Sequence, residues 1–456
     1  MSAALLLLGC TALLIPSWQR FGIIHPLTIT LALWTVVGLL FVLRPFNLEQ
    51  PSLRVTSALL LGLAALSLPA LLLDKRAESR TGRGAADRRP VQMQVRLVPL
   101  TVAVVVVAAA VIWGTLQYRA EVSAVLGMPF DQVDTKLIRW AELYGDLSLS
   151  APGGLAQSLG PLLGVLGIVG GLYHRWWWYA LVPVAVYASM QSPSRTGTLT
   201  VAVTCVFFFL LMSRSRNASL GRQSGGSASR VATIAVFTVV GALGLVYFGT
   251  TAQDLDKSEL PAGLEVAEWM PAESIQPLLY QVGGVSAFTA ALDETEGTAS
   301  PYGDTGRSVY GLVKVVQGLG FDVPTPAPFA TYVDMPIPFN TYTAFGDAYF
   351  DWGLAGVVGV FLLLGLVLHL VGTWPSRGHP VSVWAMSLMG SVLTATPIHM
   401  RLLDIDILMP GLVGCVVLSL VLRPVRGAEA PGATTVPTES ADEGSGKRPA
   451  GSPVAV

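Results

Sequence analysis

Repeated apolar runs are the feature that most constrains how this chain can fold. They extend over roughly 16 to 22 residues, the length at which an α-helix crosses the hydrocarbon core of a bilayer. Of 456 residues, 52% are hydrophobic and 12% charged, whereas soluble domains carry about 25% charged residues. The runs are too long and too uniformly apolar for barrel strands, and only helices and closed barrels satisfy their backbone in lipid. We therefore predict an all-α polytopic membrane protein.

The apolar runs predict about eleven transmembrane helices. They fall at 3–15, 27–43, 55–73, 97–116, 159–173, 176–190, 198–212, 231–248, 352–372, 381–396 and 407–422.

Two basic connections set the expected orientation. Segment 74–96 is rich in arginine, and segment 213–230 holds four arginines without one acid. Because cytoplasmic loops are enriched in Lys and Arg, we expect both in the cytoplasm and the N-terminus outside. This divides the chain into helices 1 to 8 (1–249), a large extracytoplasmic loop with short amphipathic helices (250–351), helices 9 to 11 (352–422) and a disordered cytoplasmic tail (423–456).

The loop 250–351 is by far the longest hydrophilic segment. It is rich in Pro, Gly, Tyr and Phe, a composition that favours a folded cap over a disordered linker. On the extracytoplasmic side it cannot reach ATP or nucleotide sugars, and the sequence has no Walker loop or dinucleotide fingerprint. We expect no cofactor, no nucleic-acid partner, and chemistry where this cap meets the helix ends.

Cations on the outer side run against the insertion bias, so each needs a reason. Arginine suits the binding of phosphate because its guanidinium offers paired N–H donors. Arg195 lies in a tight hairpin of small residues between two spans, where a charge is not needed for folding. His399 and Arg401 close the outer end of the span 381–396. For these residues an interfacial structural role is the alternative to a site role.

Arg307 precedes a segment with apolar residues at helical spacing. Such a helix could lie along the membrane surface and present its N-terminal amides and Arg307 to an anion. A local salt bridge between Arg307 and Asp304 is the alternative.

Asp347 and Asp351 are four residues apart, so on a helix they share a face at the mouth of the span that begins at Trp352. They are candidate catalytic residues, or else a polar collar at the end of the helix. Asp404 and Asp406 are weak candidates for a metal site, because residues two apart on a helix point about 200° away from each other and no further ligand completes a set. The three cysteines all fall in apolar runs, so we expect no metal site.

The stretch that leads into the span from 352 carries a family resemblance. Residues 340–356 read NTYTAFGDAYFDWGLAG, and they are accompanied by the Ser-Pro-Ser-Arg hairpin at 192–195 and by segments 279–288 and 301–310. Together these resemble oligosaccharide repeat-unit polymerases of the Wzy (O-antigen polymerase) type, over the part of the chain that begins near Leu159. Trp352 stands where this family has Phe, an aromatic exchange.

The resemblance implies an enzyme of the bacterial plasma membrane with its active site on the extracytoplasmic face. Such enzymes transfer a growing glycan from a polyprenyl diphosphate carrier to a lipid-linked repeat unit, and a flippase and a chain-length regulator are the partners that the resemblance adds. Arginines can stabilise the departing diphosphate, and a base must deprotonate the acceptor hydroxyl. The candidates are Arg195, Arg307 and Arg401 for the diphosphate, His399, Asp347 and Asp351 for the catalytic base, and Asn340 and Tyr342 for substrate binding.

Three other functions stay open at this point. An O-antigen ligase uses the same donor with a different acceptor, but the stretch 340–356 speaks against it. A secondary transporter would place ionisable groups near mid-membrane and show internal repeats, and the predicted spans hold almost no charge. A non-catalytic membrane subunit is the third alternative, and it predicts that none of the outer arginines matters.

Overall fold

The computed structural model describes 1–80, 93–134, 137–138, 141, 151–191, 195–219, 263–294, 307–309, 313, 316–317, 320–324, 332–373, 379–400 and 404–425. For 74–80, 151–152, 195–196, 218–219, 272–273, 373 and 405 it describes the backbone alone.

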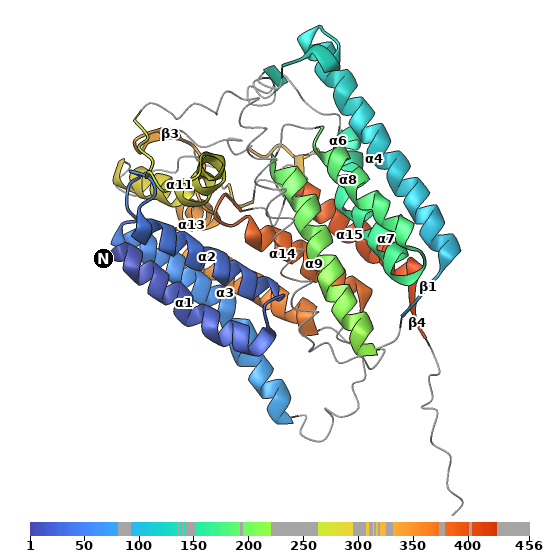
Figure 1. The fold of residues 1–456 in the computed structure, drawn as a ribbon, viewed down its shortest axis with the longest axis horizontal. Helices are drawn as coiled ribbons and strands as arrows, with labels where there is room; N and C mark the ends of the chain where they lie inside the picture. The colour runs from blue at the N-terminus through green and yellow to red at the C-terminus, as the bar shows by residue number, and fades with distance from the viewer. Residues whose placement is uncertain are drawn as a thin grey trace, which may run out of the picture. The chain divides into compact units, whose positions relative to one another are not determined.

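The described chain is mostly helical, with a few very short strands (Figure 1). Its helices are α1 (Ser2–Phe21), α2 (Pro26–Leu43), α3 (Leu53–Arg80), α4 (Leu97–Leu126), η2 (Phe130–Gln132), α6 (Ala151–Gln157), α7 (Gly160–Tyr173), η3 (Trp176–Ala180), α8 (Leu181–Ser189), α9 (Arg195–Ser219), α11 (Ala272–Glu294), α13 (Ala344–Thr373), α14 (Pro380–Thr394) and α15 (Ile405–Val421).

The strands form two antiparallel pairs. β1 (Met93–Val95) pairs with β4 (Leu422–Pro424), which fastens the start of α4 to the end of α15. β2 (Val333–Asp334) and β3 (Pro338–Phe339) form a small hairpin ahead of α13. Arg423 and Pro424, which were predicted to belong to the disordered tail, are part of β4, and the rest of that tail after 425 lies outside the described residues.

Seven helices of the described residues are long and apolar enough to cross a membrane, as an all-α multi-pass membrane protein requires. They agree with seven of the predicted spans, and α1 is longer than the run that predicted it. The seven are Ser2–Phe21, Pro26–Leu43, Leu53–Leu73, Leu97–Leu126, Gly153–Tyr173, Gly197–Asn217 and Ala344–Gly372.

The other predicted spans differ from the structure or lie outside it. Segment 176–190 was expected to be one span, but it consists of the 3-10 turn η3 and the nine-residue helix α8. A helix of nine residues is about 14 Å long, about half the thickness of a hydrocarbon core. α14 and α15 are apolar but shorter than the other spans, with 15 and 17 residues. The predicted span 231–248 lies outside the described residues.

The described helices pack around two large hydrophobic cores, and a small third cluster includes Tyr118 and Val122 of α4. One core joins α1, α2, α3, α11, the β2–β3 hairpin and α13, and we call this group the capped half. The other joins α4, α7, α8, α9 and α15, and we call it the second half. α14 belongs to both, because Met386, Met389 and Leu393 face the first core whereas Val383, Trp384 and Leu388 face the second.

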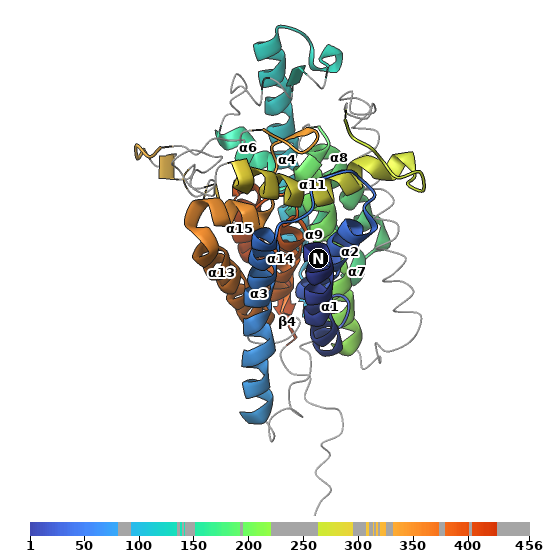
Figure 2. The same ribbon diagram turned by 90° about the vertical axis from the view of Figure 1, so that its left-hand side faces the viewer.

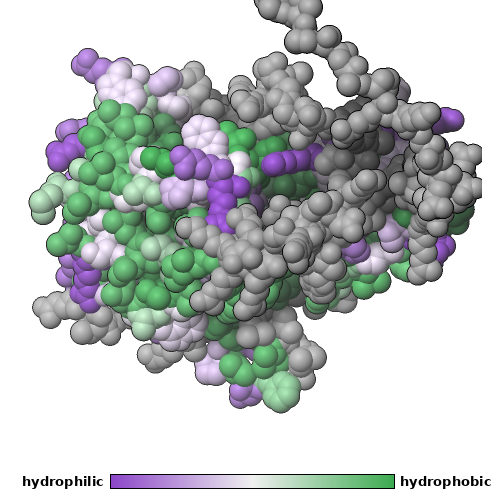
Figure 3. All heavy atoms as spheres, turned by 90° about the horizontal axis from the view of Figure 1, so that it is seen from below, coloured by the Kyte–Doolittle hydropathy of each residue, from purple (hydrophilic) through white to green (hydrophobic). Residues whose placement is uncertain are grey.

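The two ends of the capped half differ in structure. At one end α11 lies across the ends of α2 and α3 and beside the β2–β3 hairpin (Figure 2), and we call α11 and this hairpin the cap. At the other end Arg20 Nη1 donates to the carbonyl of Leu71 at 2.9 Å, and burial together with the charge of Arg214 lowers the pKa of His25 to about 4. The view from below shows hydrophilic residues among hydrophobic ones on the surface of this side (Figure 3). The cap and the basic ends of the helices therefore lie on opposite sides of the bundle.

Candidate functional site at the start of α13

α13 consists of two helical pieces. Its backbone leaves the helical conformation at Trp352 and at Gly353, where φ is 65° and ψ is −161°. Such a conformation is open to glycine at little cost. The break separates the short helix 344–351 from the longer apolar part of α13, and where the span begins stays a prediction.

Neighbouring polar groups fix the first turn of α13. The hydroxyl of Thr343 accepts a hydrogen bond from the amide of Gly346 at 3.1 Å, as an N-cap residue does. The amide of Ala344 donates to the carbonyl of Thr396 at 2.9 Å. The start of the helix is thereby joined to the turn 395–400, which follows α14.

Asp347 lies at the centre of this junction and is fully buried. Its Oδ2 accepts a hydrogen bond from the amide of Met400 at 2.8 Å. A buried carboxylate is costly unless hydrogen bonds compensate for the lost water. Asp347 therefore joins the first turn of α13 to the residue that follows His399.

The turn 395–400 is held from other sides as well. Trp34 Nε1, on α2, donates to Thr396 Oγ1 at 3.0 Å in a buried site. On α11, a Cβ at Gly284 would lie 2.7 Å from the carbonyl oxygen of Pro397, so the two backbones are in close contact. His399 is partly exposed, and its amide donates to the carbonyl of Ala395 at 3.2 Å.

Asp351 holds a different segment. Its Oδ1 accepts from the amide of Arg307 at 2.9 Å, and its Oδ2 accepts from the amide of Ser308 at 2.7 Å. A helical bond follows, from the amide of Val313 to the carbonyl of Val309 at 3.0 Å. The protein's own carboxylate therefore accepts both of these amides, and a contact of the Arg307 side chain with an anion stays a prediction. Asp304 lies outside the described residues.

Asn340 and Tyr342 precede the helix. Tyr342 is fully buried, and its ring lies 5.5 Å from that of Phe350 in an edge-to-face contact. Asn340 is partly buried. Tyr342 is thus part of the packing here, and a substrate contact of either residue stays a prediction.

Arg195 and Arg401 are the two remaining arginines, and the structure describes the side chain of neither. Arg195 is the first residue of α9, where only the backbone is described, and Arg401 lies outside the described residues. The structure therefore joins Asp347 to the turn of His399 and Asp351 to the segment of Arg307. A contact of Arg195 or Arg401 with them stays a prediction.

One neighbour of the site was missed in the sequence. Arg54, in the first turn of α3, donates from Nε to the hydroxyl of Tyr349 at 2.7 Å, and its guanidinium lies 5.4 Å from the centre of the Tyr349 ring. Tyr349 stands on α13 between the two aspartates. The sequence places Arg54 just before the predicted span 55–73, and this position does not identify its partner 295 residues away.

The connection between α2 and α3 anchors the cap. Asn47 bonds the backbone of Gly263 and Glu265, each at 2.9 Å. The hydroxyl of Ser286, on α11, donates to the carbonyl of Glu49 at 2.7 Å. Burial raises the pKa of the Glu49 carboxyl, and Asp293 and Glu294 raise it further.

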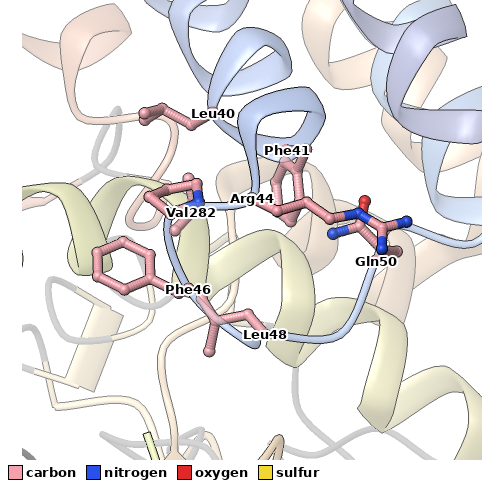
Figure 4. Close-up of a pocket in the computed structure, with 8 residues that line it drawn as sticks. Leu40, Phe41, Arg44, Phe46, Leu48, Gln50 and Val282 are labelled. Carbon is pink, nitrogen blue, oxygen red and sulfur yellow. The ribbon is translucent and has the colours of Figure 1, made fainter. Parts of the chain in front are cut away.

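A small pocket opens beside this connection (Figure 4). Arg44 and Gln50 supply its polar side chains. Its volume of about 10 Å³ holds about one water molecule and cannot admit a sugar ring. The residues around it are Leu40, Phe41, Arg44, Pro45, Phe46, Leu48, Gln50 and Val282.

Within the described part of the chain, no three His, Cys, Asp or Glu residues come close enough to hold a metal ion. Asp404 stands at the N-cap position of α15 and Asp406 in its first turn.

Comparison with known protein families, curated proteins and solved structures finds no match to this chain.

Proposed function

We propose that this protein polymerises lipid-linked oligosaccharide repeat units on the extracytoplasmic face of a bacterial plasma membrane. The product would be a cell-surface polysaccharide such as O-antigen, capsule or exopolysaccharide. The resemblance of 340–356 to repeat-unit polymerases supports this reaction. The geometry adds one observation, which is that the same stretch holds both the turn of His399 and the segment of Arg307.

The reaction makes two demands on the site. The bond between the anomeric carbon of the growing glycan and its polyprenyl diphosphate breaks, and Arg195, Arg307 and Arg401 stabilise the negative charge that stays on the diphosphate. The acceptor hydroxyl forms the new glycosidic bond and gives its proton to a base. We assign this base to His399, which is partly exposed, rather than to Asp347 or Asp351, whose oxygens accept backbone amides.

A strain that lacks this protein tests the reaction. Such cells are expected to build and export single repeat units and to fail to make long polymer. Unchanged polymer length in this strain would overturn the proposal. Polymer of normal length that stays on its lipid carrier would favour a ligase, and loss of exported repeat units would favour a transporter.

A further inference from the structure

We infer that Asp347 and Asp351 are positioning residues, which fix the turn of His399 and the segment of Arg307 relative to each other. The inference rests on the proposed function for its catalytic meaning. Its structural part rests on three hydrogen bonds from backbone amides to the two carboxylates.

Asp347 is badly placed for direct chemistry. Its side chain is fully buried, and a general base must come within hydrogen-bond reach of the proton that it removes. Its Oδ2 accepts from Met400, the residue next to His399. Asp347 therefore acts on the reaction through the backbone that carries the histidine.

Asp351 uses both of its oxygens. Oδ1 and Oδ2 each accept from one of two successive amides, those of Arg307 and Ser308. A carboxylate that accepts two backbone amides fixes the direction of that segment, and such charge-assisted bonds are stronger than neutral ones. Asp351 therefore sets where the Arg307 side chain leaves the backbone.

The two aspartates are one helical turn apart, about 6 Å along the axis. Both stand before the break at Trp352 and Gly353, so they share the rigid helix 344–351. The two segments that they hold come from distant parts of the chain. This short helix thus holds in place both the turn of the proposed base, His399, and the segment of one proposed diphosphate ligand, Arg307.

The way in which the amides are held gives a sharp test, because Oδ2 of Asp347 accepts from Met400, whereas Asp351 needs both oxygens for Arg307 and Ser308. Asparagine keeps a single acceptor oxygen. In Asp347→Asn that oxygen can still accept from Met400, whereas in Asp351→Asn one of the two amides must lose its partner. Alanine removes every acceptor at either position.

The first measurement is hydrogen exchange of the full-length protein in nanodiscs, which does not depend on activity. Asp347→Ala is expected to speed exchange at Met400 by roughly 10- to 100-fold and to leave 307–308 unchanged. Asp351→Ala is expected to do the reverse. Asp347→Asn should keep Met400 protected, and Asp351→Asn should expose one of its two amides. Asp334→Asn, at an exposed aspartate of the β2–β3 hairpin, is the matched control and should change neither segment.

The second measurement is polymer synthesis by the same variants at matched membrane levels. A positioning role predicts that Asp347→Asn keeps polymerisation and its pH profile within a few-fold of wild type, whereas Asp347→Ala loses most of it. An Asp347→Asn variant that is as inactive as Asp347→Ala, with Met400 still protected, would show that the carboxylate itself reacts. Alanine variants without faster exchange in either segment would also overturn the inference. If the wild type makes no polymer, the proposed function fails while the exchange pattern still decides the structural part.

Discussion

The capped half and the second half of the bundle are built from similar apolar helices but are joined in different ways (Figure 1). In the capped half, side chains bond segments far apart in the sequence, as Trp34 does with Thr396 and Asp347 with Met400. In the described part of the second half, the side chains of Thr115 and Ser189 bond carbonyls three or four residues away, and Trp384 Nε1 donates to the carbonyl of Gly411 on the next helix. Apolar packing suffices to assemble a bundle, whereas the cap needs directional bonds to place its segments.

Close contact between helix backbones gives the largest expected effect. A Cβ at Gly365, on α13, would lie 2.2 Å from the carbonyl oxygen of Leu66, on α3. Because backbone cannot move aside as a side chain can, we expect Gly365→Ala to lower the free energy of unfolding by about 3 kcal/mol, measured by thermal denaturation in detergent.

Two matched variants sharpen this test. In the second half, a Cβ at Gly164 would meet the Cys205 thiol at 2.4 Å, a side chain that can rotate, so Gly164→Ala should cost less. Gly359 has nothing within 4 Å, and Gly359→Ala should be neutral or stabilise by up to about 1 kcal/mol. If Gly365→Ala and Gly164→Ala lowered the free energy of unfolding equally, this difference between the halves would be contradicted.

The second prediction asks whether the second half contributes to the site. If Arg195 holds the donor diphosphate, Arg195→Ala should slow polymerisation roughly ten- to a hundredfold, and Arg195→Lys should keep part of the activity because it keeps the charge but not the planar fork. Chain-length distributions at matched expression measure this. Arg119→Ala is the control, because Arg119 pairs with the exposed Asp131 and surface pairs contribute about 0 to 1 kcal/mol. Wild-type chain lengths from Arg195→Ala would make Arg195 an interfacial anchor.

The smallest effect concerns the bond between α2 and the turn 395–400. Thr396→Val removes the acceptor of the buried Trp34 Nε1, and a buried donor without a partner costs about 1 to 2 kcal/mol. Thr115→Val in the second half removes only a bond to the preceding turn of its own helix, so its cost should be smaller. The denaturation midpoints of the two variants measure this difference in stability. A larger loss of stability in Thr115→Val than in Thr396→Val would contradict the comparison of the two halves.

The sequence predicted those parts of the fold that depend on local composition. The apolar runs at 27–43 and 55–73 match α2 and the apolar part of α3, Leu53–Leu73, closely, because the length and hydropathy of a span are properties of the segment itself. Segment 176–190 was also apolar, but its three tryptophans 176–178 belong to the 3-10 turn η3, and the short helix α8 follows. Hydropathy does not distinguish these from one continuous helix.

The site was only partly predictable, because a local pattern does not show which distant segments meet. The spacing of Asp347 and Asp351 indicated a shared helix, which is confirmed. Their partners could not be deduced, because Met400 is 53 residues from Asp347 and Arg307 is 44 residues from Asp351. Which amide meets which carboxylate depends on how the helices pack, and no local pattern in the sequence records it.

The most direct test of the central claim is polymer synthesis by the purified protein in proteoliposomes, with a polyprenyl-diphosphate-linked repeat unit as the only glycan substrate. We expect a ladder of longer lipid-linked glycans with release of polyprenyl diphosphate, and its loss in His399→Ala with the fold intact. Folded wild-type protein that leaves the repeat unit unchanged, or a His399→Ala variant that makes the same ladder, would contradict the account.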